Sequence, residues 1–181
     1  MDLLNTILQA GGGAVVQNMS KSLGLGESQT QSALGQLLPV VARAMSKNGS
    51  TGDGLGALMG ALGKGTHQKY VDNPSMLGNA DTISDGNSIL GHLFGSKDVS
   101  RNVATRASAN TGIGADILKK MLPMVASVAM GALSQKAAGS ALQGAQGQSS
   151  GLGGLASLLD FDGDGSIADD LLGIAARKFF G

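Results

Sequence analysis

The spacing of apolar residues between positions 113 and 133 constrains the fold of this chain more than any other sequence feature. This spacing places them on one wide stripe of an α-helix, whereas a half-buried strand would alternate with a period of two. The chain contains no comparable period-two run of β-branched residues. The sequence therefore predicts an all-α fold. The residues of the stripe recur three and four positions apart and are Ile117, Leu118, Met121, Leu122, Val125, Val128, Ala129, Ala132 and Leu133.

Composition narrows the possible functions. The 181-residue chain has no Cys, so disulfides, thiolate catalysis and Cys-based zinc or iron–sulfur sites are excluded. Its two histidines, His67 and His92, are far apart in sequence and have no partner one helical turn away. A His-based zinc or catalytic site is therefore not expected. We expect a protein that is not an enzyme.

Turn-rich and Gly/Ser-rich stretches divide the chain. Residues 73–86 are rich in Asn, Asp, Gly and Ser, and residues 144–151 consist mainly of Gly, Gln and Ser. Such compositions bury little apolar surface and are typical of linkers. The sequence thus predicts a first helical unit at 1–72, a linker at 73–86, a second helical unit at 87–143, a linker at 144–151 and a C-terminal helix–loop–helix at 152–181.

The two predicted units share a sequence pattern. An ungapped shift of 84 residues aligns Leu34 with Leu118, the pair Leu38-Pro39 with Leu122-Pro123, and the pair Val41-Ala42 with Val125-Ala126. A register that holds over some 45 residues favours duplication of a helical unit. We therefore expect two small helical bundles in tandem. Their predicted helices cover 3–10, 14–23 and 28–45 in the first unit, and 88–94, 99–110 and 115–136 in the second.

Three motifs stand out in the second half of the chain. They are Asn87-Ser88-Ile89-Leu90-Gly91-His92-Leu93-Phe94-Gly95, the Leu122-Pro123 pair in the long helix, and the acidic stretch 159–172. Together they resemble the bacterial YidB-like family, best over 87–172, with 3–62 as a more degenerate copy. The resemblance implies a compact all-helical domain related in shape to homeodomain-like bundles. No established enzymatic activity comes with this family.

The acidic stretch is the one pattern that carries metal chemistry. Asp160, Asp162 and Asp164 alternate and are followed by Gly165, which matches the opening of a calcium loop, where carboxylates converge on a hard cation. The carbonyl of Ser166 would occupy the seventh position. Asp170, or alternatively Asp169, would close a shortened loop. Since Leu171 stands where a bidentate Glu is usual, the sequence predicts a weak or structural Ca2+ site.

The same residues allow an interpretation without an ion. Ser166 or Asp164 would cap the last helix, and Asp169 and Asp170 would lie favourably near its positive end. This explains some of the acids but not their strict alternation.

The charge of the chain is unevenly distributed. Residues 1–159 carry 11 basic and 8 acidic residues, and residues 160–181 carry 2 basic and 5 acidic ones. The net charge of zero is therefore a basic body joined to an acidic tail.

Low charge and abundant glycine favour association with another protein molecule. Only 14% of residues are charged and 30 are Gly, so solubility has little electrostatic help and apolar helix faces can associate. Met124 and Met130, if they face outward, would offer an adaptable groove, although core packing is the simpler interpretation. The leading expectation is a non-enzymatic helical interaction or structural protein that forms a homo-oligomer or binds another protein.

Two alternatives remain open. Five basic residues make the second unit basic in patches, so a DNA-associated regulator with a homeodomain-like bundle is one alternative. These residues lack aromatic interleaving and a dense Arg face, and the chain has no net positive charge, so we do not expect nucleic-acid binding. The other is a membrane-active or exported Gly-rich protein whose C-terminal helix, 174–180, rests on a membrane surface. The five basic residues are Lys97, Arg101, Arg106, Lys119 and Lys120.

Targeting signals are weak. The first five residues contain Asp2 where a secretory signal would carry Lys or Arg. The uncharged stretch between Lys120 and Lys136 has 15 residues, fewer than the ~20 needed to span a bilayer, so we expect a buried helix and no transmembrane segment. The expected location is the cytoplasm, with export without an N-terminal signal as the alternative.

Overall fold

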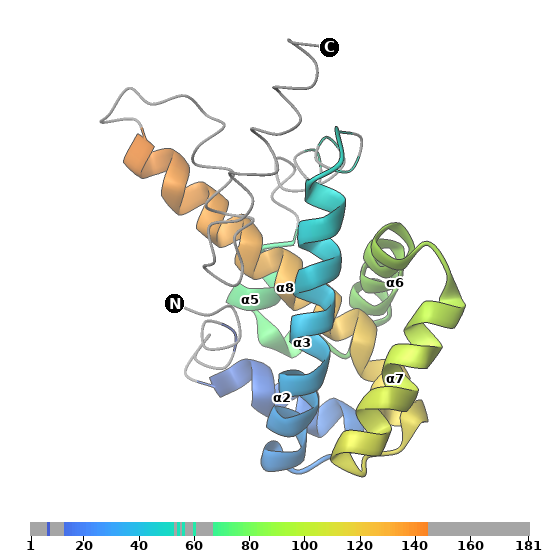
Figure 1. Ribbon diagram of the computed structural model, residues 1–181. Coiled ribbons are helices and arrows are strands. Elements are labelled where there is room, and N and C mark those ends of the chain that lie inside the picture. The colour runs from blue at the N-terminus through green and yellow to red at the C-terminus, as the bar shows by residue number, and fades with distance from the viewer. Residues whose placement is uncertain are drawn as a thin grey trace, which may run out of the picture.

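The chain forms only helices in the part that the computed structural model describes: residues 13–52 and 67–144, with the single positions 7, 54, 56 and 60. Of residues 136–144 only the backbone is described. The all-α prediction is confirmed there. The elements are α2 (Ala14–Leu23), α3 (Glu27–Gly49), α5 (Lys69–Asp72), the 3-10 helix η2 (Pro74–Met76), α6 (Ala80–Phe94), α7 (Lys97–Thr111) and α8 (Ala115–Gly144) (Figure 1).

Four of the predicted helices coincide with α2, α3, α7 and α8, with ends that differ by at most about two turns. Glycine ends three of the described helices. Gly24, Gly95 and Gly112 follow α2, α6 and α7 with φ values of 67°, 69° and 71°, a left-handed conformation that side chains disfavour. At the start of α7 the Ser96 hydroxyl accepts a hydrogen bond from the Val99 N–H. The predicted helix 3–10 lies outside the described residues except for Ile7.

Residues 73–86, which the sequence predicts as a linker, form η2 and the first half of α6 instead. The helix predicted to begin at Ser88 therefore begins at Ala80. Its first two turns lack an apolar run, which is why periodicity misses them. They are held by Thr82, which is buried and donates a hydrogen bond to the Met76 carbonyl at 2.6 Å, and by the close approach of Gly86 to α8.

Helix α8 is the centre of the bundle. Every residue from Met121 to Ser134 is buried, and α2, α3, α5, α6 and α7 all contact this helix. By length and composition, one helical window in the described part, Ala115–Gln135, could cross a membrane, and 83% of that window is buried inside the fold. Its burial by five neighbouring elements identifies it as the core helix of the bundle. Met124 and Met130 are buried in this core, so they do not offer an outward groove.

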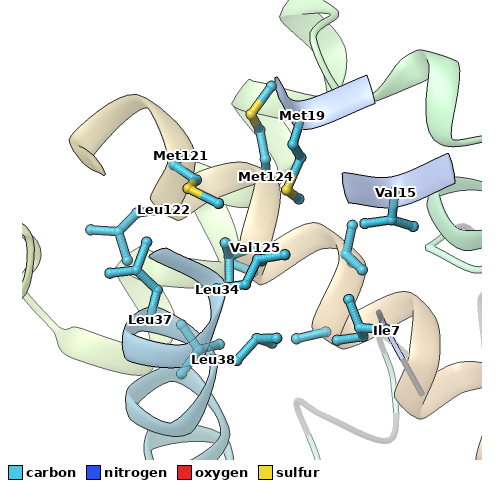
Figure 2. Close-up of a cluster of buried hydrophobic side chains, with 14 of the residues drawn as sticks. Ile7, Val15, Met19, Leu34, Leu37, Leu38, Met121, Leu122, Met124 and Val125 are labelled. Atoms are coloured by element: carbon cyan, nitrogen blue, oxygen red, sulfur yellow. The ribbon is translucent and has the colours of Figure 1, made fainter. Parts of the chain in front are cut away.

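The core joins helices from both sides of the predicted linker. Leu34, Leu37 and Leu38 of α3 meet Met121, Leu122, Met124 and Val125 of α8, while Val15 and Met19 of α2 close the cluster (Figure 2). Burial of such apolar side chains is the main source of stability in a bundle of this kind. The described helices therefore share one continuous hydrophobic core.

Candidate functional site

The predicted calcium ligands lie outside the described residues. These are Asp160, Asp162, Asp164, Ser166, Asp169 and Asp170. Within the described ranges no group of three or more His, Asp or Glu side chains is placed to hold a metal ion. The features with functional potential in this part of the chain are a partly buried polar cluster and an exposed two-helix surface.

The partly buried polar cluster consists of His67, Tyr70 and Asp85. Tyr70 is fully buried, and its hydroxyl donates a hydrogen bond to the Asp85 carboxylate across α5 and α6. Burial and this hydrogen bond raise the pKa of Tyr70. His67 is half-buried with its ring 6.1 Å from that of Tyr70, and its Nδ1 atom is buried without a hydrogen-bond partner in the described structure. Burial lowers the pKa of His67, and the nearby Asp85 offsets this in part.

The cluster ties short helix α5 to its neighbours. Gly131 of α8 leaves room for the His67 carbonyl oxygen, which would lie 2.6 Å from a Cβ at that position. The Ser127 hydroxyl of α8 donates to the Thr82 carbonyl of α6 at 3.1 Å. Asp85 is occupied by the Tyr70 hydroxyl, whose raised pKa disfavours a role as a base. We therefore interpret these polar groups as structural contacts that hold α5, α6 and α8 together.

The exposed surface is formed by α3 and α7, which pack against each other. The side chains of Gln36 and Asn110 meet in a hydrogen bond of 2.9 Å, which fixes the flanks on which the two helices face each other. Residues four, seven and eleven positions away on a helix share a flank. The α3–α7 surface is therefore made of two stripes with the same spacing. They are Gln36, Val40, Arg43 and Lys47 on α3, and Val99, Val103, Arg106 and Asn110 on α7.

The α3–α7 surface combines exposed apolar side chains with positive charge. Val40 and Val99 are the exposed large hydrophobic residues of the described structure, with exposed fractions of 38% and 39%. Arg43, Lys47 and Arg106 are exposed, and none of them forms an ion pair with an acid in the described ranges. No acidic residue belongs to either stripe. An anionic segment with apolar side chains would complement this surface.

The basic patches predicted from the sequence are only partly brought together. Arg101 pairs with Asp98 at 2.7 Å, and Lys119 pairs with Asp116 at 2.6 Å, which lowers the pKa of Asp116. Arg106 lies on the flank of α7 that carries Asn110, and Asn110 is hydrogen-bonded to Gln36 on the flank of α3 that carries Arg43 and Lys47. The sequence analysis did not include Arg43 and Lys47 in a basic patch, because it assigned α3 and α7 to separate helical units. The one signal available was the repeated four-, seven- and eleven-residue spacing on each helix.

The described residues form an all-helical bundle with an exposed two-helix face. A family model described as a bacterial protein of unknown function, DUF937, matches residues 5–136. The chain therefore belongs to this family, of which YidB is a member, and the resemblance to the YidB-like family is confirmed. No curated protein and no solved structure gives a significant match.

Proposed function

We propose that the chain is a non-enzymatic helical interaction protein that self-associates through the α3–α7 surface. The observation that carries this proposal is the exposure of Val40 on α3 and Val99 on α7, on the flanks of two packed helices that also carry Gln36 and Asn110. Val103 is half-buried one turn from Val99 on α7 and extends the apolar area of that helix. Association would remove these side chains from water while Arg43, Lys47 and Arg106 remain at the rim.

Sedimentation velocity over a range of protein concentrations tests the proposal. The wild-type chain should sediment faster as its concentration rises. The double variant Val40→Asn/Val99→Asn, which keeps the net charge, should remain monomeric to higher concentration. Thr105→Asn is the matched control, because Thr105 is exposed on another flank of α7. A wild-type chain that is monomeric at every concentration would refute self-association.

A duplicated unit is the finer architecture that we propose for the bundle. The 84-residue shift places α2 on the first part of α7, and α3 on α8, with Pro39 and Pro123 inside the two long helices. Aligned pairs such as Leu34 with Leu118 and Val41 with Val125 are buried. Contacts are also reciprocal, since α2 and α7 each pack on both long helices. These features support two interlocked copies of one helical unit.

Calcium binding by the C-terminal loop remains part of the proposed function. The alternating carboxylates of Asp160, Asp162 and Asp164 support a site of low affinity, because the bidentate Glu is missing. Calorimetry with Ca2+ should give heat for the wild-type chain and none for Asp162→Ala. Asp81→Ala removes an exposed carboxylate from α6 and should bind as wild type. The absence of heat at millimolar Ca2+ would refute the site.

A further inference from the structure

We propose that the acidic C-terminal segment, residues 160–170, binds the α3–α7 surface of its own chain and competes there with self-association. This inference deepens the proposed function, since it names an occupant that regulates the same surface. The two ideas are separable by experiment, because one concerns contacts within a chain and the other contacts between chains.

Charge complementarity is the first argument. The surface presents Arg43, Lys47 and Arg106 without an acid in either stripe. Residues 160–170 contain five Asp and no basic residue, which makes them the densest acidic segment of the chain. The attraction between residues 160–170 and these cations is strongest where the cations have no other ion-pair partner among the described residues, as on the α3–α7 surface.

Apolar complementarity is the second argument. Leu159, Phe161 and Ile167 alternate with or flank the aspartates. These side chains match the exposed Val40 and Val99, which lie on the same flanks as the three cations. A purely polar anion would leave the valines exposed, whereas this segment offers both kinds of contact.

Chain connectivity is the third argument. Helix α8 ends at Gly144, so 15 residues, 145–159, separate it from Asp160. A chain of this length spans at most about 50 Å, enough to reach across a small domain. A tethered segment meets its site at an effective concentration on the order of millimolar. The segment of the same chain therefore outcompetes that of a second copy in dilute solution.

Zero-length carbodiimide cross-linking of the full chain tests the inference. The reagent joins a Lys amine to a carboxylate only when the two are in contact. In dilute, calcium-free, low-salt buffer, mass spectrometry should find Lys47 linked to residues 160–170 several-fold more often than Lys21, an exposed lysine on α2. High salt should reduce this link, because it screens exposed charges. Equal linking of Lys47 and Lys21 would overturn the inference.

Two further measurements separate a specific contact from general attraction. Arg43→Gln/Arg106→Gln should reduce the Lys47 link several-fold, whereas Arg101→Gln, which removes an exposed cation from another flank of α7, should leave it unchanged. An equal loss in both variants would overturn the inference. In a mixture of 14N- and 15N-labelled chains, the linked peptides should carry one isotope only. Predominantly mixed peptides would show a contact between copies and overturn the intramolecular proposal.

Competition is tested on the association equilibrium. The variant Asp160→Asn/Asp162→Asn/Asp164→Asn should lose the Lys47 link and sediment as an oligomer at lower concentration than the wild-type chain. An unchanged association curve would refute competition. If the wild-type chain shows the intramolecular link but neither it nor this variant ever associates, the self-association proposal fails while the contact of the segment stands.

Discussion

At the scale of single residues, two glycines set the distance between helices. A Cβ atom at Gly86 of α6 would collide with the backbone carbonyl of Pro123 in α8, and one at Gly131 of α8 would meet the His67 carbonyl. Backbone atoms cannot move aside as flexible side chains do. The close packing of α5, α6 and α8 therefore depends on the absence of side chains at these positions.

Substitution of Gly86 should measure this dependence. Gly86→Ala forces α6 away from α8 and should lower the free energy of unfolding by about 1–3 kcal/mol. Gly91→Ala is a matched control on the same helix, since a Cβ there has nothing within 4 Å. It should raise the stability by about 0.5–1 kcal/mol because alanine favours helix. Urea unfolding of both variants checks the signs, and equal effects would contradict the packing argument.

His67 gives the fold a dependence on pH. Burial lowers the pKa of His67 below its ordinary value of 6.5, so the unfolded chain takes up the proton more readily than the folded one. The contribution of His67 to the free energy of unfolding is therefore complete above pH 6.5, and it is lost as the pH falls through the lowered pKa. His67→Gln should remove this part of the pH dependence, whereas His92→Gln, on the exposed side of α6, should retain it. Urea midpoints between pH 7.5 and 5 provide the measurement.

At the scale of elements, helix α3 continues from Glu27 to Gly49 through Pro39. Proline inside a helix lacks the N–H that would donate to the carbonyl four residues earlier, here Gly35. Pro39 is exposed, so no core contact compensates for the missing hydrogen bond. Pro123 lies inside α8 but is buried, with its carbonyl against Gly86. A proline inside the helix therefore affects the stability of the fold differently in α3 and in α8.

Pro39→Ala should stabilise the fold. Restoring the hydrogen bond to Gly35 outweighs the entropy gained by the unfolded chain, and we expect the free energy of unfolding to rise by about 1–2 kcal/mol. Pro74→Ala is the control, because Pro74 begins η2, where proline is well suited. That variant should be no more stable than the wild type. Thermal unfolding followed by circular dichroism distinguishes the two outcomes.

The predictability of each element follows from how its contacts are made. Apolar spacing was sufficient for α2, α3 and α8, because each buries a stripe of its own side chains. The first half of α6 could not be found this way, since its inward contacts come from Thr82 and Gly86. Helical periodicity does not register a hydroxyl or a missing side chain.

At the scale of the whole molecule, a single core explains why the α3–α7 surface exists. Residues 121–134 of α8 are buried on every side, and α3 and α7 pack on this helix and on each other. Gln36 and Asn110 are 74 residues apart in sequence and meet in one hydrogen bond. Sequence spacing contained each stripe separately, but only the packing of the helices joins the flank with Arg43 and Lys47 to the flank with Arg106, through the contact of Gln36 with Asn110. The buried contact of Tyr70 with Asp85 was missed for the same reason.

The central claim, that the α3–α7 surface is the interaction surface, is tested most directly by thiol protection. Because the chain has no Cys, Val99→Cys and Thr105→Cys each introduce a single reactive thiol on α7. In the Asp160→Asn/Asp162→Asn/Asp164→Asn background, in which the acidic segment no longer occupies the surface, the reaction rate with a small neutral maleimide should fall several-fold at position 99 as the protein concentration rises, and stay constant at position 105. Rates that are alike at the two positions and independent of concentration would contradict the claim.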